Sequence, residues 1–313
     1  MQAFTFPGQG SQSVGMGRDL AVQYAEARAV FEEVDEALGQ KLSDIMFNGP
    51  DDELTLTENA QPALMAVSMA IIRVLGAHGV ELSAHADYVA GHSLGEYSAL
   101  AAAGSFSLAD TARLLQIRGR AMQQAVPVGA GAMAALLGLE FDTANDIAQQ
   151  AAHHGEVCSA ANDNAPGQVV ISGSAAAVAR AIDMAKEQGA KRAIELPVSA
   201  PFHCSLMTPA AEAMAAALAE VTINPPSTPL VANVTAEANT DPDLIRQQLV
   251  AQVTGVVRWR ESVVWMAGQG VTSLLEIGSG KVLSGLAKRI DRGLNATALS
   301  EPADVEAFLE TIK

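Results

Sequence analysis

The feature that most restricts the fold of this chain is a five-residue turn, Gly91-His92-Ser93-Leu94-Gly95. A short apolar strand is expected before it over Asp87–Ala90, and a helix after it over Leu94–Ala103. Glycines two residues to either side of Ser93 let the backbone bend sharply and let the helix pack closely. A serine on such a turn presents its hydroxyl beside a helix N-terminus. The pattern predicts an α/β fold with a nucleophilic serine, although Gly-x-Ser-x-Gly also arises by chance.

Strand-like and helix-like segments alternate along much of the chain, which favours an α/β fold. Strands are expected over Ala3–Phe6 and Ser273–Ile277, and helices over Gln61–His78 and Leu108–Gln124, the last with Ser107 as its N-cap. A length of 313 residues suits one large domain with an inserted or appended lobe. Apolar residues make up 49% of the chain, enough for a full core.

The middle of the chain has a pattern that is complete in itself. Its segments follow the order strand, helix, strand, strand, helix, strand, which is the ferredoxin-like order. We expect a turn over 162–167 between the two central strands. The expected elements are Ala132–Leu139, Asp142–His153, Val157–Ala161, Gln168–Gly173, Ser174–Gln188 and Arg192–Leu196. The predicted fold is therefore a large α/β-hydrolase-like domain with a parallel sheet, residues 1–127 and 198–313, carrying an inserted ferredoxin-like subdomain, residues 128–197.

Charge and composition exclude several classes of function. The formal net charge is −16, with 35 acidic against 19 basic residues, so we expect repulsion from nucleic acids and anionic membranes. The longest apolar stretch, Ala63–Leu75, contains Ser68 and Arg73 and is too short to span a bilayer. The N-terminus has no signal-peptide pattern. The two cysteines have no metal-type spacing. We expect a cytoplasmic protein with no metal site.

A serine nucleophile needs a base within hydrogen-bond reach, and a histidine is the usual choice. His203 differs from the other histidines because it lies in a turn of small residues, Ser199–Cys204, where the chain leaves the expected insert. Junctions between lobes commonly line clefts. The six histidines are His78, His85, His92, His153, His154 and His203. We interpret His203 as the base and His92, next to Ser93, as a residue that shapes the turn or the pocket.

A carboxylate partner for this histidine is missing from the pattern. An ordinary serine hydrolase uses an Asp or Glu to orient the base, but no acidic residue lies between Glu195 and Glu212. A main-chain carbonyl can orient a histidine equally well. The absence argues against an ordinary esterase.

Five motifs in order resemble the malonyl-CoA:acyl carrier protein transacylases of bacterial type II fatty acid synthesis. The resemblance runs from about Phe4 to Ile290. The motifs are Pro7-Gly8-Gln9-Gly10-Ser11-Gln12, Gly91-His92-Ser93-Leu94-Gly95-Glu96, Gln116-Ile117-Arg118-Gly119-Arg120, Pro201-Phe202-His203-Cys204 and Glu276-Ile277-Gly278-Ser279-Gly280-Lys281.

The resemblance implies a malonyl ester on Ser93, with His203 as base and later as acid. It implies an oxyanion hole formed by Gln9 and the main-chain N–H of Leu94. Gln252 matches the segment whose main-chain carbonyl orients the histidine, which would explain the missing carboxylate. Family members often carry Asn-Pro shortly after this glutamine, where this chain has Gly255-Val256.

Arg118 matches the arginine that binds the malonyl carboxylate in this family. Its spacing supports the assignment, because Arg118 follows Leu115 by three residues and precedes Met122 by four, on the apolar face of its helix. A charge on that face must be paired or must face a cavity, and a guanidinium suits a carboxylate. The alternative is a buried salt bridge. The resemblance also implies pocket positions at Gln61, Asn162 and Phe202.

The expected function is transfer of a malonyl group from malonyl-CoA to the phosphopantetheine thiol of acyl carrier protein, in two steps and without a cofactor. We expect a monomer that binds no nucleic acid and no membrane. The alternatives are an acyltransferase of a polyketide or malonate decarboxylase system, a serine esterase or thioesterase, and an inactive carrier-binding subunit.

Overall fold

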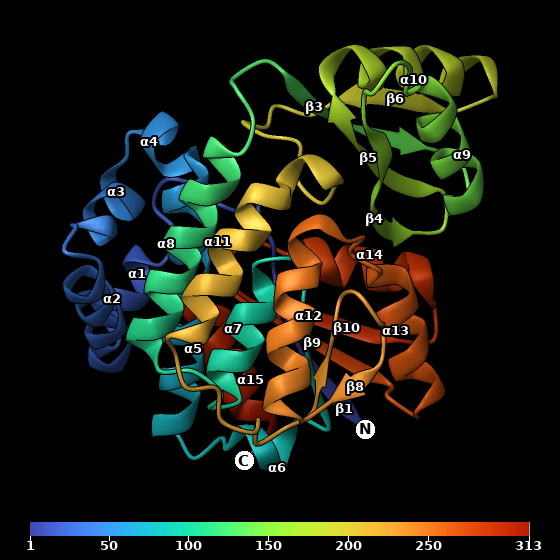
Figure 1. The fold of residues 1–313 in the computed structure, drawn as a ribbon. Helices are drawn as coiled ribbons and strands as arrows, with labels where there is room; N and C mark the ends of the chain where they lie inside the picture. The colour runs from blue at the N-terminus through green and yellow to red at the C-terminus, as the bar shows by residue number, and fades with distance from the viewer. Residues whose placement is uncertain (313) are drawn as a thin grey trace.

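The computed structural model describes residues 1–312, which form two sheets of different kinds (Figure 1). The larger sheet has six strands in the order β10-β9-β1-β2-β7-β8. Every neighbouring pair in it is parallel except β7 and β8. Its strands are β1 (Gln2–Phe6), β2 (Tyr88–Gly91), β7 (Leu230–Val231), β8 (Ala238–Asn239), β9 (Ser273–Ile277) and β10 (Asn295–Leu299). A mixed α/β fold with a largely parallel sheet is therefore confirmed.

Helices cover the larger sheet and connect its strands (Figure 1). Those before the smaller sheet are α1 (Arg18–Gln23), α2 (Ala25–Leu38), α3 (Leu42–Asn48), α4 (Asp51–Thr55), α5 (Thr57–Ala77), α6 (Leu82–His85), α7 (Gly95–Ala102) and α8 (Leu108–Gln124). Those after it are the 3-10 turn η1 (Ser205–Met207), α11 (Thr208–Ala219), α12 (Pro242–Thr254), α13 (Trp259–Gly268), α14 (Val282–Ile290) and α15 (Pro302–Thr311). Ser107 caps α8 as expected, accepting a hydrogen bond from the Asp110 N–H.

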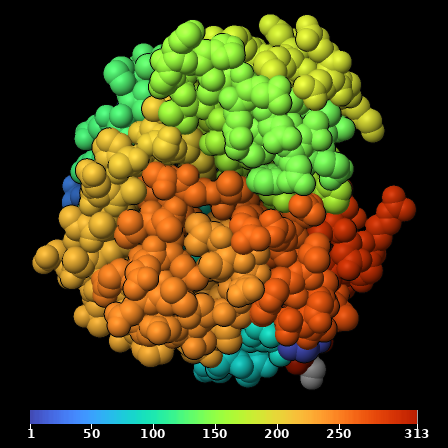
Figure 2. All heavy atoms as spheres, turned by 45° about the vertical axis from the view of Figure 1, so that its right-hand side comes forward, coloured from blue at the N-terminus to red at the C-terminus, as the bar shows by residue number. Residues whose placement is uncertain are grey.

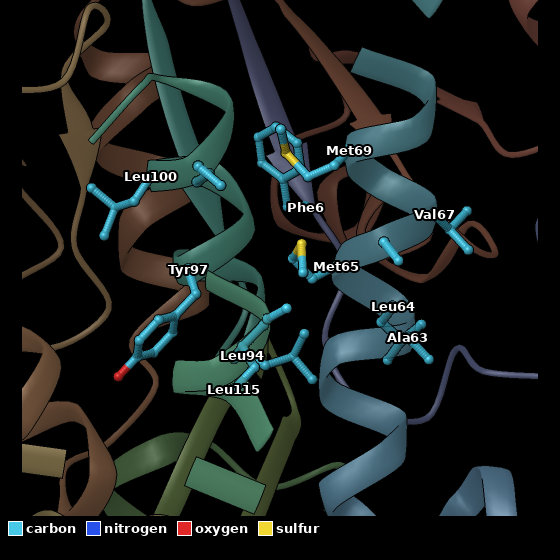
Figure 3. Close-up of a cluster of buried hydrophobic side chains, with 14 of the residues drawn as sticks. Phe6, Ala63, Leu64, Met65, Val67, Met69, Leu94, Tyr97, Leu100 and Leu115 are labelled. Atoms are coloured by element: carbon cyan, nitrogen blue, oxygen red, sulfur yellow. The ribbon is translucent and has the colours of Figure 1, made fainter. Parts of the chain in front are cut away.

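The core lies between the central strands and α5, α7 and α8. Strands of a parallel sheet are covered on both faces, so they are apolar at successive positions. In β1 the four successive residues from Ala3 to Phe6 are all buried, although Thr5 among them is polar. Figure 3 shows Met65 of α5 and Leu94 at the start of α7 meeting beside Phe6. This packing holds the first turn of α7 against the end of β1, which is where the candidate site forms.

Helix α5 is longer than its apolar stretch suggested. Its 21 residues are apolar enough to cross a membrane by length and composition, but 78% of the most apolar window is buried inside the protein. Because most of this window is buried against other parts of the chain, α5 is a core helix.

The smaller sheet is antiparallel, with strand order β4-β5-β3-β6. Its elements follow the order strand, helix, strand, strand, helix, strand, and they have a hydrophobic core of their own. They are β3 (Gly131–Leu137), α9 (Phe141–Ala151), β4 (Cys158–Ala165), β5 (Gln168–Ser174), α10 (Ala175–Glu187) and β6 (Arg192–Glu195). Figure 2 shows this part as a green and yellow lobe seated on the orange segment that follows it in sequence.

The expected turn over 162–167 is wrong. Asn162, Asp163 and Asn164 belong to β4, and the turn is only Pro166-Gly167. Asn and Asp are typical of turns because their side chains bond to nearby backbone. Here the Asp163 and Asn164 side chains instead bond to Arg260 and His92 in the larger part of the protein, so the strand continues through them.

The end of β4 ties the two parts of the molecule together. The Asp163 N–H donates to the Val257 carbonyl at 2.9 Å, and the Val257 N–H donates to the Ala161 carbonyl at 2.9 Å. The Asp163 carboxylate is buried and accepts from Nε of Arg260 at 2.9 and 3.0 Å. The bonded segment follows α12 directly, so the position of the smaller sheet is coupled to the end of that helix.

Arg260→Ala is expected to lower the free energy of unfolding by about 3–5 kcal/mol, because it leaves the Asp163 carboxylate buried without its cation. Lys186→Ala is the matched control, since it removes the exposed ion pair to Asp183 and should change stability by less than about 1 kcal/mol. Urea unfolding followed by circular dichroism measures both. Equal effects for the two variants would contradict a role for the buried pair.

Candidate active site

Ser93 lies at the sharp connection between β2 and α7. Its φ of 54° is in the left-handed region, which residues with a side chain rarely occupy. Asn233 holds the turn from behind: its Oδ1 accepts from the Ser93 N–H at 2.8 Å and its Nδ2 donates to the Gly91 carbonyl at 2.7 Å. The strand, turn and helix expected around Ser93 are therefore present.

Gly91 and Gly95 are required by close backbone approach. A Cβ on Gly91 would lie 1.9 Å from the main chain of Gly95, and one on Gly95 would lie 2.2 Å from the Phe6 carbonyl oxygen. Strand β1 and helix α7 touch at this point.

Gly95→Ala is expected to destabilise the protein by at least about 2 kcal/mol, because main-chain atoms of β1 must move to make room. Gly76→Ala is the control: a Cβ there meets nothing within 4 Å, and alanine should stabilise α5 by up to about 1 kcal/mol. Thermal unfolding compares the two variants. A Gly95→Ala protein as stable as the parent would contradict the close packing.

His203 reaches Ser93 from a turn that is 110 residues further along the chain. Its Nε2 lies 2.8 Å from Ser93 Oγ. Its Nδ1 lies 2.8 Å from the Gln252 main-chain oxygen and 3.2 Å from that of Gly255. Because both neighbours of Nδ1 are acceptors, this nitrogen carries the proton and Nε2 is free to accept one from the serine.

The oxygen atoms that orient His203 belong to the end of α12. The last carbonyls of a helix have no partner within it and carry partial negative charge. They therefore bind the N–H of His203 and favour the imidazolium that forms when Nε2 takes a proton. Gly255-Val256 keeps this arrangement, and the Gly255 carbonyl adds a second acceptor.

Burial keeps His203 neutral in the free protein. Desolvation lowers its pKa to about 3, and the positive charge of Arg118 acts in the same direction. The hydrogen bonds to the Gln252 and Gly255 carbonyls oppose this shift. The unprotonated ring is therefore the resting form at neutral pH, as a general base requires.

Arg118 is a buried cation beside the nucleophile, with 1% of its surface exposed. It lies on the apolar face of α8, as its spacing predicts. Its nitrogens donate to Gln61 Oε1 at 2.8 Å, Gln252 Oε1 at 2.8 Å and Ser93 Oγ at 3.1 Å. These acceptors are all neutral. Within residues 1–312, Arg118 therefore forms no buried salt bridge, which was the alternative interpretation. Its Nε has no partner among them.

A cavity of about 470 Å³ opens in front of Ser93, His203 and Arg118. Other expected site residues line it too, namely Gln9, Gln61, His92, Asn162 and Phe202. Leu94 and Gln252 are buried behind it. The cavity is thus lined by residues that follow strands of the larger sheet, such as Gln9 and Ser93, and by Asn162 of β4 in the smaller sheet.

Gln9 and His92, like Gln61, already have hydrogen-bond partners in the structure. Gln9 Nε2 donates to Thr57 Oγ1 at 3.4 Å, and this amide has a second N–H that an oxyanion could accept from. His92 Nε2 lies 2.8 Å from Asn164 Oδ1, and burial lowers the His92 pKa. His92 therefore joins the turn to β4, as a residue that shapes the pocket would.

Sequence reasoning missed Asn233 and Glu96, which stand behind the nucleophile. Asn233 follows β7, the strand next to β2, and the carboxyl ends of neighbouring parallel strands meet at one edge of a sheet. Its place after a buried strand was the signal that could have identified it. Glu96 lies three residues after Ser93 in an apolar helix, where a charge is unexpected.

Nucleophile, base and cation together suit acyl transfer at a serine with a charged acyl group. The described residues, 1–312, contain no group of three or more His, Cys, Asp or Glu placed to hold a metal ion.

Comparison with known proteins agrees with this geometry. The acyl transferase domain family matches residues 3–295. The chain belongs to the acyl transferase family. It is 49% identical over 308 residues to the malonyl CoA-acyl carrier protein transacylase of Escherichia coli (strain K12), covering 98% of each.

Solved structures of malonyltransferases are also similar to this chain. The acyl-carrier-protein-S-malonyltransferase of Bartonella henselae superimposes with a TM-score of 0.97 at 57% identity, over 99% of each chain. A malonyl-transacylase in complex with a type II PKS acyl-carrier protein superimposes with a TM-score of 0.96 at 44% identity, also over 99% of each chain.

Proposed function

We propose that this protein transfers a malonyl group from malonyl-CoA to the phosphopantetheine thiol of an acyl carrier protein, through an ester on Ser93, and so supplies fatty acid biosynthesis. The observation that carries the proposal is Arg118 Nη2 lying 3.1 Å from Ser93 Oγ inside one cavity. An acyl group bound to Ser93 must extend past this guanidinium. A buried cation with neutral acceptors is suited to the free carboxylate of malonate. The names of the relatives support the same substrates.

In the proposed mechanism, His203 Nε2 takes the proton of Ser93 as Ser93 Oγ attacks the thioester carbonyl of malonyl-CoA. The main-chain N–H of Leu94 and the amide of Gln9 stabilise the oxyanion. His203 then returns the proton to the CoA sulfur as the C–S bond breaks. In the second step the carrier thiol attacks the ester carbonyl and gives its proton to His203. His203 passes this proton to Ser93 Oγ as the ester C–O bond breaks. Arg118 keeps the malonyl carboxylate in place throughout, with Gln61, Asn162 and Phe202 around it.

A polyketide carrier is the second candidate for the acceptor. One similar structure is a transacylase bound to a type II PKS acyl-carrier protein, so a carrier of that kind suits a surface like this one. Parallel assays with a fatty acid carrier and a polyketide carrier distinguish the two by their kcat/KM values.

The finer description of the fold belongs to the same proposal. We describe residues 1–127 and 198–312 as an α/β-hydrolase-like subdomain, and residues 128–197 as a ferredoxin-like one; residue 313, which the expected range included, lies outside the described residues. The strand order β4-β5-β3-β6 with two helices supports the second name. The chemistry uses side chains and main-chain groups alone, so we propose no cofactor, and we propose a cytoplasmic monomer.

The test is mass spectrometry of the protein after a brief incubation with malonyl-CoA. The expected result is one malonyl adduct, mapped by proteolysis to Ser93, absent from Ser93→Ala and discharged by phosphopantetheinylated carrier. Release of free malonate in place of malonyl-carrier would instead assign a thioesterase. The absence of any adduct on the wild-type protein would contradict the proposal.

A further inference from the structure

Glu96 is a buried carboxylate that the proposed mechanism does not use. It lies in the first turn of α7 with none of its surface exposed. Its Oε2 accepts from Gln252 Nε2 at 2.7 Å and from the Asn233 N–H at 3.2 Å. Its Oε1 is buried without a hydrogen-bond partner in residues 1–312. Burying a carboxylate with an unpartnered oxygen opposes folding, so its presence beside Ser93 suggests a functional use.

Gln252 connects this carboxylate to the reacting groups. Its side-chain Oε1 accepts from Arg118 at 2.8 Å, and its main-chain oxygen accepts from His203 Nδ1 at 2.8 Å. Its Nε2 donates to Glu96 and also to the Ser93 carbonyl, the latter at 3.0 Å. One residue thus contacts both the candidate base and the candidate carboxylate-binding cation.

Glu96 determines which way the Gln252 amide faces. A reversed amide would place its oxygen against two acceptors, the Glu96 carboxylate and the Ser93 carbonyl, and would turn its NH₂ group toward the Arg118 cation. Both contacts would be repulsive. The ionised Glu96 carboxylate therefore keeps Gln252 Oε1 directed at Arg118.

We propose that Glu96 is a positioning residue for acyl transfer: through Gln252 it holds Arg118 and the carbonyl that orients His203. The inference rests on the proposed function. In serine hydrolases the carboxylate of the triad bonds directly to the histidine. Glu96 acts instead through one intervening residue, Gln252.

The proposal predicts that the rate of Ser93 acylation depends on pH in a way that the titration of His203 does not explain. Burial raises the pKa of Glu96 to about 7, while hydrogen bonds from Gln252 and Asn233 and the charge of Arg118 on α8 lower it in part. Tyr97, on the same helix, also faces this group. As the pH rises through about 7, Glu96 ionises and the acylation rate should increase. His203, with its pKa of about 3, is already neutral there.

The experiment compares Glu96→Gln with Glu276→Gln. Glu276 is the matched control: it is equally buried and accepts from the Leu283 and Ser284 N–H groups at 3.0 and 2.7 Å, but it does not line the cavity. The readout is the single-turnover rate of Ser93 acylation, followed by mass spectrometry from about pH 5 to about pH 9. The substrate is malonyl-N-acetylcysteamine, which has no titrating phosphate.

The expected result is an ionisation near neutral pH in the wild type and in Glu276→Gln, and a flat profile in Glu96→Gln. Above pH 8 the Glu96→Gln rate should be about tenfold lower or more, the range for losing a hydrogen bond to a charged group. A Glu96→Gln profile parallel to that of the wild type overturns the proposal, whether its rates are equal or uniformly reduced.

The wild-type profile decides the matter if Glu96→Gln does not fold. An ionisation near pH 7 then supports the proposal, and a flat wild-type profile overturns it. Failure of the proposed function is a separate result, because it would show as no malonyl adduct on wild-type Ser93 at any pH.

Discussion

His203→Ala is expected to slow acylation of Ser93 by roughly 10²–10⁴-fold, the range in which general bases contribute. The imidazole is the base closest to the nucleophile, with Nε2 at 2.8 Å from Ser93 Oγ and Nδ1–H held by two carbonyls. Without it the serine must lose its proton to water. The remaining rate should come from the oxyanion donors and from bound substrate.

The measurement is a quenched single-turnover reaction with malonyl-CoA, read as the mass of the acylated protein. His92→Ala is the control, because His92 also lines the cavity but has its Nε2 engaged by Asn164. Its effect should be at least tenfold smaller. A His203→Ala loss of less than about tenfold, or an equal loss in His92→Ala, would contradict the assignment of the base.

Arg118→Ala is expected to lower kcat/KM for malonyl-CoA by at least about 10²-fold, because the substrate carboxylate would enter a buried site with no cation. Activity with acetyl-CoA should fall much less, since the acetyl group has no charge to pair. The ratio of the two kcat/KM values is therefore the quantity to measure. A loss of folded protein lowers both activities equally and cancels from this ratio.

Two further variants sharpen this test. Arg118→Lys keeps the charge but not the planar fork, so it should restore only part of the malonyl preference. Arg120→Ala removes an exposed arginine two residues further along α8, which pairs with Glu58, and should leave the ratio unchanged. A malonyl preference that survives in Arg118→Ala would show that another group recognises the carboxylate.

Local signals predicted much of the larger part of the molecule. The strand, turn and helix around Ser93 follow from glycine spacing, and the bounds of α8 follow from its apolar period and from Ser107. The burial of Arg118 also follows from that period, because Leu115 and Met122 on the same face are buried. Each of these features depends on residues close in sequence, which is where propensity and periodicity act.

Features that depend on distant partners were missed. Polar residues at 162–164 suggested a turn, but β4 continues through them because Asp163 meets Arg260 and Asn164 meets His92. Glu96 was recognisable in the sequence only as an unexpected charge in an apolar helix. Only its contact with Gln252, 156 residues away, gives it a role.

The sequence by itself determined that Ser93 stands on a sharp turn, that His203 and Arg118 are unusual among their residue types, and that the chain has an α/β pattern. The tertiary structure alone decided that these three side chains share one cavity, which carbonyls orient His203, and which acceptors Arg118 contacts. The physical reason is that strand order brings distant segments to one edge of the sheet. Side chains that never meet in the sequence become hydrogen-bond partners only there.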